Sequence, residues 1–150
     1  MKAEIIQLGE TPQDVVNQEE IIQACCAKWD KSYIHLGKYK YRNDFALHKE
    51  KELKSIVEVK QHNQEFFRGM NFAKYLEGIQ FAENWGVFFT FVSRWEGVIK
   101  YLLIHDGDKL LADPKLQLTG GTPTGRAENR DDRLEPMACW YPPKYDWKEL

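Results

Sequence analysis

Residues 12–29 carry apolar side chains at steps of three and four, which is the spacing of an α-helix with one buried face. Thr11 supplies a capping hydroxyl, Pro12 suits the first helical position, and Asp14 places an acid three residues after the cap. These signals predict a helix from Thr11 to about Trp29. The positions expected on its buried face are Val15, Gln18 or Glu19, Ile22, Cys25 or Cys26, and Trp29.

Short runs rich in valine, isoleucine and aromatic residues predict strands farther along the chain. Two pairs of runs read as hairpins, one closing through a charged turn at residues 49–52 and the other through Trp95-Glu96-Gly97. From Asp106 onward the pattern predicts mostly loops. The expected strands are residues 32–36, 43–47, 55–60, 87–94, 98–104 and, within the tail, 133–141.

A second helix is predicted from Asn71 to Trp85, where apolar residues again follow a helical period and Gly86 ends the pattern. Its expected inward face consists of Phe72, Leu76, Ile79 and Ala82. Helices that alternate with apolar strands indicate the α/β class, as an α+β mixed sheet flanked by helices. The chain shows no internal repeat or linker, so one domain over residues 1–150 is expected.

The overall composition limits the kind of nucleic-acid contact that is possible. The chain has 150 residues, 21 Lys+Arg against 23 Asp+Glu, and a pI near 6.1. A slightly acidic domain does not coat nucleic acid through a general positive field, so any such contact must be weak and local. A chain of this length buries roughly 70% of its unfolded surface and needs no structural zinc to fold.

The three cysteines and the start of the chain indicate the compartment. Cys25 and Cys26 are adjacent in the first predicted helix, where they are poorly placed to pair, and Cys139 has no assured partner. Residues 1–20 show no basic segment followed by an apolar one, and no apolar run approaches the ~20 residues that cross a bilayer. We therefore expect a cytoplasmic protein that is not bound to membranes.

The first predicted hairpin carries the candidate chemistry. Because side chains alternate along a strand, Glu58 and Lys60 share one face while Val57 and Val59 share the other. Asp44 lies fourteen residues before Glu58 on the other arm and is expected opposite it. Two carboxylates suit Mg²⁺, which prefers oxygen ligands, and a nearby lysine could hold or deprotonate a metal-bound water. This combination is typical of phosphodiester hydrolysis.

These residues resemble the motif of the PD-(D/E)XK nuclease superfamily, particularly its small, often phage-encoded members. The resemblance implies a restriction-endonuclease-like core, Mg²⁺ or Mn²⁺ bound by Asp44, Glu58 and the Val59 carbonyl, and Lys60 assisting the attacking water. It also implies DNA as substrate, a location in the host cytoplasm if the chain is phage-encoded, and possible homodimers. The matching segments are Lys38, Asp44-Phe45-Ala46-Leu47, Glu58-Val59-Lys60, Lys74-Tyr75, Gly78, Phe81-Ala82, Arg94-Trp95-Glu96-Gly97, Gly120-Gly121, Asp131-Asp132 and Glu135-Pro136.

Two positions depart from the superfamily pattern. Asn43 stands where the motif has proline, and Gln61-His62-Asn63 replaces a more usual Cys-Arg after the lysine. The second departure leaves open how the rim of the site would face substrate.

Four further residues are auxiliary candidates, each with an ordinary structural alternative. Glu20 in the first helix could complete the metal shell, or it could be a solvated helix residue. Lys38 and Lys74 could bind phosphates, and Gln80 could border the cleft, but each could also be merely exposed. Glu52-Leu53-Lys54 repeats the acid-x-Lys spacing and is interpreted as surface.

The sequence therefore leaves three functional hypotheses open. The first is the metal-dependent nuclease, and the second is a catalytically inactive nuclease fold that serves as a phage-related binding or accessory protein. The third is an oligomerisation or host-factor-binding domain. At the level of the residues, Glu58 and Lys60 could also form only a surface ion pair, which contributes ~0–1 kcal/mol.

Overall fold

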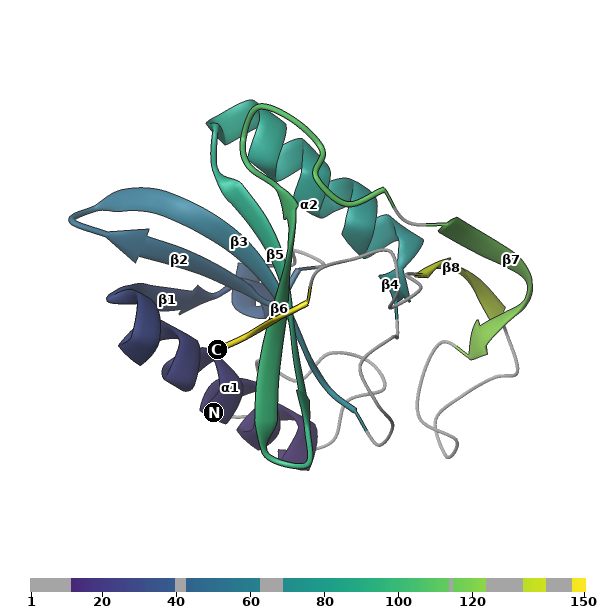
Figure 1. Cartoon of the computed structure of the whole chain (residues 1–150), viewed down its shortest axis with the longest axis horizontal. Coiled ribbons are helices and arrows are strands. Elements are labelled where there is room, and N and C mark those ends of the chain that lie inside the picture. The colour runs from purple at the N-terminus through teal and green to yellow at the C-terminus, as the bar shows by residue number, and fades with distance from the viewer. Residues whose placement is uncertain (1–11, 40–42, 63–68, 114, 124–133, 140–146) are drawn as a thin grey trace.

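The computed structural model describes residues 12–39, 43–62, 69–113, 115–123, 134–139 and 147–150. Within these ranges the chain forms a six-stranded sheet in the order β1-β2-β3-β5-β6-β9 and a three-stranded sheet in the order β4-β8-β7 (Figure 1). The elements are α1 (Pro12–Trp29), β1 (Ser32–His35), the 3₁₀ helix η2 (Leu36–Tyr39), β2 (Phe45–Lys49), β3 (Glu52–Gln61), β4 (Met70–Asn71), α2 (Phe72–Trp85), β5 (Phe88–Trp95), β6 (Val98–His105), β7 (Lys115–Pro123), β8 (Leu134–Cys139) and β9 (Lys148–Glu149).

The large sheet is mixed, which confirms the predicted α+β class. Strands β3 and β5 are parallel neighbours, while β1–β2, β2–β3, β5–β6 and β6–β9 pair antiparallel. The parallel step from β3 to β5 is made through α2, because two parallel strands need a long crossover. Both predicted hairpins are present, and β3 and β5 lie at the centre of the sheet.

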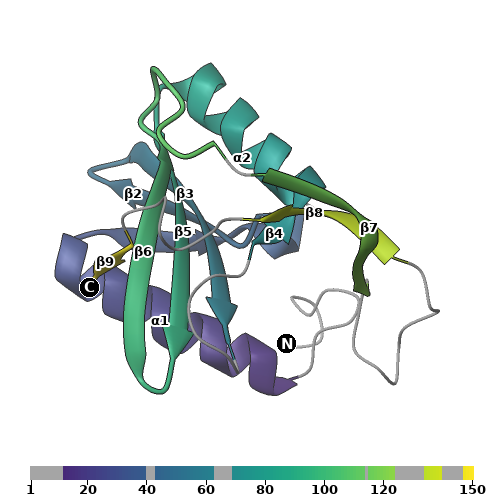
Figure 2. The same cartoon turned by 45° about the vertical axis from the view of Figure 1, so that its right-hand side comes forward.

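Each helix packs on its own face of this sheet, as Figure 2 shows. On the α1 side, Ile22 packs with Val57 and Val59 of β3. On the α2 side, Tyr75 and Ala82 pack with Ile56 of β3 and with Phe89 and Phe91 of β5. Alternation along β3 thus sends Val57 and Val59 toward α1 and directs Glu58 and Lys60 toward the α2 side.

The position of α2 is fixed at both ends and at its middle. The Asn71 side chain caps the start by accepting a hydrogen bond from the Ala73 amide at 2.7 Å. Gly86 ends the helix, as predicted, and does so in the left-handed conformation with φ 63°. In between, a Cβ added at Gly78 would lie 2.2 Å from Phe89 Cζ, so only glycine permits this close approach to β5.

The predicted inward face of α2 is wrong at one position. Leu76 is 45% exposed, whereas Tyr75, Gly78 and Ala82 are buried. Because the helix approaches the sheet through Gly78, the buried stripe runs through residues 75, 78 and 82 instead of through 76. Phe72 and Ile79 contact the core from its margins.

Two other predictions need correction. The turn of the first hairpin contains only Glu50 and Lys51, both at positive φ, because Lys49 and Glu52 already pair as strand residues. The tail is less loop-rich than expected, since β7 pairs with β8 and β9 adds to the edge of the large sheet. The glycine pair and the proline of β7 concealed it from a propensity-based prediction.

Some predicted features lie outside the described residues, including the Thr11 cap, Asn63 and the acids at 131–132. The first helix itself is confirmed, with Val15, Ile22, Cys25 and Cys26 buried. Within the described part of the chain, no helix combines the length and the apolar character needed to span a membrane. The expectation of a single domain stays a prediction.

Candidate active site

The first hairpin brings two carboxylates together at the point where β2 begins. Phe45 pairs with Val57 in the antiparallel register, which places Asp44 opposite Glu58. Asp44 Oδ2 accepts a hydrogen bond from the Val59 amide at 2.9 Å, so its side chain continues the pairing with β3 just before β2 begins. The register therefore explains why acids fourteen residues apart converge.

Both carboxylates are removed from solvent. Asp44 is 1% exposed and Glu58 is 4% exposed. Glu58 Oε2 accepts from the Lys74 ammonium at 2.9 Å, and Glu58 Oε1 faces the Asn43 amide at 3.4 Å. Among the described residues, Asp44 Oδ1 has no hydrogen-bond donor. A buried oxygen without a partner is costly, so this atom marks a position for a cation, a water or a proton.

The acidity of Asp44 reflects this environment. Burial, and next the negative charge of Glu58, raise the pKa of Asp44 from 3.8 to about 7. The Lys74 ammonium and the Val59 amide act in the opposite direction but do not offset the burial. Near neutral pH the two acids can share a proton, and a divalent cation would replace that proton.

Asn43 is the residue whose role the sequence did not reveal. It is fully buried, and its amide nitrogen donates to the Lys74 backbone carbonyl at 3.2 Å as well as facing Glu58. One side chain thereby links the hairpin to the first turn of α2. The only hint in the sequence was that Asn43 stands where the superfamily motif has proline.

Lys60 lies at the end of β3, two residues beyond Glu58 and on the same side of the strand by alternation. Its side chain is exposed, in contrast to the buried carboxylates. It also takes part in an interaction within the chain. The pattern of an acid and an amine on one face of this strand is therefore present, with the amine toward solvent.

The auxiliary candidates separate into two groups. Lys74 contacts the carboxylate pair directly through Glu58. Glu20 instead pairs with Arg94 at 3.1 Å on the α1 side of the sheet, so the structure does not bring it to Asp44. Gln80 is exposed on α2, about 9 Å along the helix axis from Lys74. Lys38 belongs to η2, and its side chain is outside what the structure describes.

The expected surface role of the second acid-x-Lys triplet agrees with the structure. Lys54 and Glu52 form an ion pair at 2.8 Å, with side chains 40% and 72% exposed. The pair lies at the start of β3, at the other end of the strand from Lys60.

Residues 6–137 match the family described as "Phage putative PDDEXK endonuclease". The chain belongs to this family. The match includes the whole hairpin and both helices, and the predicted membership and restriction-endonuclease-like core are thus confirmed.

Comparisons with individual proteins add less than the PDDEXK family does. No curated protein matches the chain. Among solved structures, the Holliday junction resolvase Hjc of Archaeoglobus fulgidus is similar, with 11% sequence identity and a TM-score of 0.44. The similarity covers 57% of this chain and 70% of the resolvase chain.

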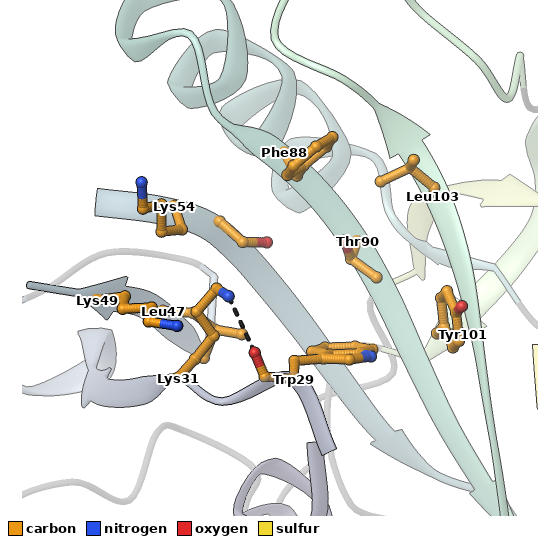
Figure 3. Close-up of a pocket in the computed structure, with 10 residues that line it drawn as sticks. Trp29, Lys31, Leu47, Lys49, Lys54, Phe88, Thr90, Tyr101 and Leu103 are labelled. Atoms are coloured by element: carbon orange, nitrogen blue, oxygen red, sulfur yellow. Dashed lines mark hydrogen bonds between the residues drawn. The ribbon is translucent and has the colours of Figure 1, made fainter. Parts of the chain in front are cut away.

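The face of the sheet opposite the carboxylates contains a pocket of about 550 Å³ beyond the end of α1. Figure 3 shows its lysines, Lys31, Lys49 and Lys54, toward one end, and Phe88, Tyr101 and Leu103 toward the other. Lys49 pairs with Asp30 at 2.6 Å. Neither Asp44 nor Glu58 lines this pocket, so it is separate from the candidate active site of this PDDEXK family member.

Proposed function

We propose that this chain is a divalent-metal-dependent nuclease that hydrolyses phosphodiester bonds in DNA. The observation that carries the proposal is the buried pair of Asp44 and Glu58, in which Asp44 Oδ1 has no donor among the described residues. Membership of a PDDEXK endonuclease family supports the same chemistry.

The residues at the pair fit a hard cation such as Mg²⁺ or Mn²⁺. Carboxylate and carbonyl oxygens are the ligands these ions prefer, and Mg²⁺ keeps several waters, so few protein ligands suffice. Because the Val59 amide points to Asp44, the carbonyl of the same strand residue points to that side as well. In the described part of the chain, no group of three or more His, Cys, Asp or Glu side chains is arranged to hold a metal, so the side-chain ligands proposed here are the two carboxylates alone.

We assign metal binding to Asp44, Glu58 and the Val59 carbonyl, and assistance of the attacking water to Lys60. A bound ion would lower the pKa of the water it coordinates and would stabilise the negative charge that develops on the phosphate. Asn43 orients Glu58 through its amide contact. The Lys60 ammonium, exposed at the end of the same strand face, offsets negative charge that develops on the phosphate oxygens.

The test is cleavage of plasmid and linear DNA by wild type, Asp44→Ala and Lys60→Ala, with Lys54→Ala as the matched surface lysine. We expect EDTA to abolish cleavage, and each of the first two variants to lose about 10²–10⁴-fold in rate. Lys54→Ala should cleave as wild type does. Full activity of Asp44→Ala or Lys60→Ala would refute the assignment.

One observation favours a second candidate function, a nuclease-fold binding protein without catalysis. Glu58 already has a cation partner in Lys74, so the pair is partly neutralised within the chain. This alternative predicts that the wild-type protein leaves DNA intact in Mg²⁺ and in Mn²⁺, and that neither ion binds at Asp44. The same cleavage assay, with metal titration, separates the two functions.

A further inference from the structure

Lys74 occupies an unusual position for a cationic residue. It is the third residue of α2, in the first turn, where the amide groups of a helix concentrate partial positive charge. Lysine is favoured at the opposite end of a helix, and the first turn of α2 contains no acid to compensate. Its charge is instead offset from β3, where Glu58 Oε2 lies 2.9 Å from Lys74 Nζ.

The contact lies at the boundary between the buried pair and solvent. The Lys74 side chain is 29% exposed and that of Glu58 is 5% exposed. The Asn43 amide donates to the Lys74 backbone carbonyl and so fixes the backbone from which the Lys74 side chain extends. The ammonium is carried on a flexible four-carbon stem, so it can change position while the backbone of α2 stays in place.

A divalent ion on both carboxylates would compete with this ammonium. Glu58 Oε2 is held by Lys74, and Glu58 Oε1 faces the Asn43 amide. A double positive charge and an ammonium repel each other strongly over a few ångströms in a poorly solvated site. Binding of the ion therefore requires the ammonium to leave Glu58.

We propose that Lys74 is the resident counter-ion of the Asp44–Glu58 pair, and that a divalent metal displaces its ammonium, which then binds a phosphate oxygen of the substrate. This inference rests on the proposed function. It makes Lys74 a competitor of the metal before binding and a contact for substrate afterwards. No covalent step is involved, since one cation replaces another.

Calorimetric titration with Mg²⁺ and with Mn²⁺, without DNA, tests the displacement directly. We expect Lys74→Met to bind either ion about tenfold more tightly than wild type, because the competing charge is gone. Lys54→Met removes a lysine from an exposed ion pair and should leave the affinity unchanged. Lys74→Arg keeps the charge and should not bind more tightly. Unchanged or weaker binding by Lys74→Met would overturn the proposal.

A second measurement uses the wild-type protein and does not depend on whether Lys74→Met folds. The ε-methylene signal of Lys74 is assigned in ¹³C-lysine-labelled protein by its loss in Lys74→Arg. On saturation with diamagnetic Mg²⁺ we expect it to move to the position of solvent-exposed lysines. A signal that stays in place while the metal binds would show that Lys74 remains on Glu58, which contradicts the displacement.

The two proposals fail in different ways. If wild type binds Mg²⁺, Asp44→Asn does not, and Lys74→Met binds as wild type does, only the displacement is wrong. If wild type shows no metal binding that depends on Asp44, the proposed nuclease function is wrong as well.

Discussion

Near the end of β3, the two faces of the sheet carry contrasting clusters of polar side chains. On the α1 side, Gln61 accepts from Arg94 Nε at 2.6 Å, and Arg94 Nη2 donates to Glu20 at 3.1 Å and to Asn17 at 3.4 Å. On the α2 side, Asp44 and Glu58 are more deeply buried, and Asp44 Oδ1 lacks a donor among the described residues. Both groups contain acids near a cation. In the described part of the chain, the first group contains no buried side-chain atom without a partner, whereas the second leaves a buried acceptor for something else to bind.

The comparison shows why the acid-x-Lys spacing alone is a weak guide. Glu52 and Lys54 have it too, but they meet solvent and each other. Glu20 is an acid near the same strand end, but it lies across the sheet from Asp44. Burial together with an unsatisfied oxygen distinguishes the candidate site from these neighbours.

The largest expected effect comes from exchanging one acid on each face for its amide. Asp44→Asn should reduce DNA cleavage by about 10²–10⁴-fold, because a metal-binding charge is removed. Glu20→Gln should change the rate less than about twofold, since its partner Arg94 also bonds to Gln61. Initial rates on supercoiled plasmid measure both. Equal losses in the two variants would remove the distinction between the faces.

The packing beneath each face offers the next contrast. Ile22→Ala on the α1 side should lower the free energy of unfolding by about 2–5 kcal/mol through the cavity it leaves. Gly78→Ala on the α2 side should lower it by about 1–3 kcal/mol, because the added methyl meets the Phe89 ring. Urea denaturation gives both values.

Metal affinity should separate these two packing variants. Because the added methyl of Gly78→Ala would meet the Phe89 ring, we expect it to displace α2 from β5 and so to shift Lys74 relative to Glu58, whereas Ile22→Ala should leave this contact in place. We expect only Gly78→Ala to change the dissociation constant for Mn²⁺ under conditions where both proteins are folded. A change confined to Ile22→Ala would contradict the separate roles of the faces.

The pH dependence of stability should come from the α2 side. Since the pKa of Asp44 rises from 3.8 to about 7, the folded chain binds more protons than the unfolded chain between these values. Without metal, the stabilisation of wild type relative to Asp44→Asn is therefore present below about pH 4 and lost as the pH rises through about 7. Denaturation in EDTA at about pH 5 and about pH 8 should show a change of a few kcal/mol. A constant difference would be inconsistent with the raised pKa.

The smallest effect is expected for the α1-side network itself. Arg94→Met should cost about 1 kcal/mol of stability, because its ion pair with the half-exposed Glu20 is screened by solvent. Metal affinity should stay at the wild-type value. Thermal unfolding with and without Mn²⁺ measures the two quantities together.

The sequence predicted the parts of the site that follow from strand alternation and register. Strand alternation alone places Glu58 on the face away from Val57, and pairing of the two strands in a hairpin places Asp44 opposite Glu58. Asn43 could not be assigned in the same way, because its role depends on where α2 packs. That packing is set by the close approach at Gly78, which also rotates the buried stripe from Leu76 to Tyr75.

Two further features could not be derived from the sequence. A helix pattern shows that Glu20 is polar, but not which face of the sheet the helix covers, so the sequence left open whether Glu20 faces the site or solvent. Strand β7 contains glycines and a proline, and it is formed by pairing with β8 despite its low intrinsic preference. In both cases contacts distant in sequence decide the outcome.

The most direct test of the account is the location of Mn²⁺ by anomalous scattering in crystals soaked in the ion. We expect one strong peak within ligand distance of Asp44 Oδ1 and Glu58, near the Val59 carbonyl, with the Lys74 ammonium moved off Glu58. A crystal that shows no peak at this pair, or one only on the α1 side of the sheet, would contradict the assignment of the α2 face as the metal site.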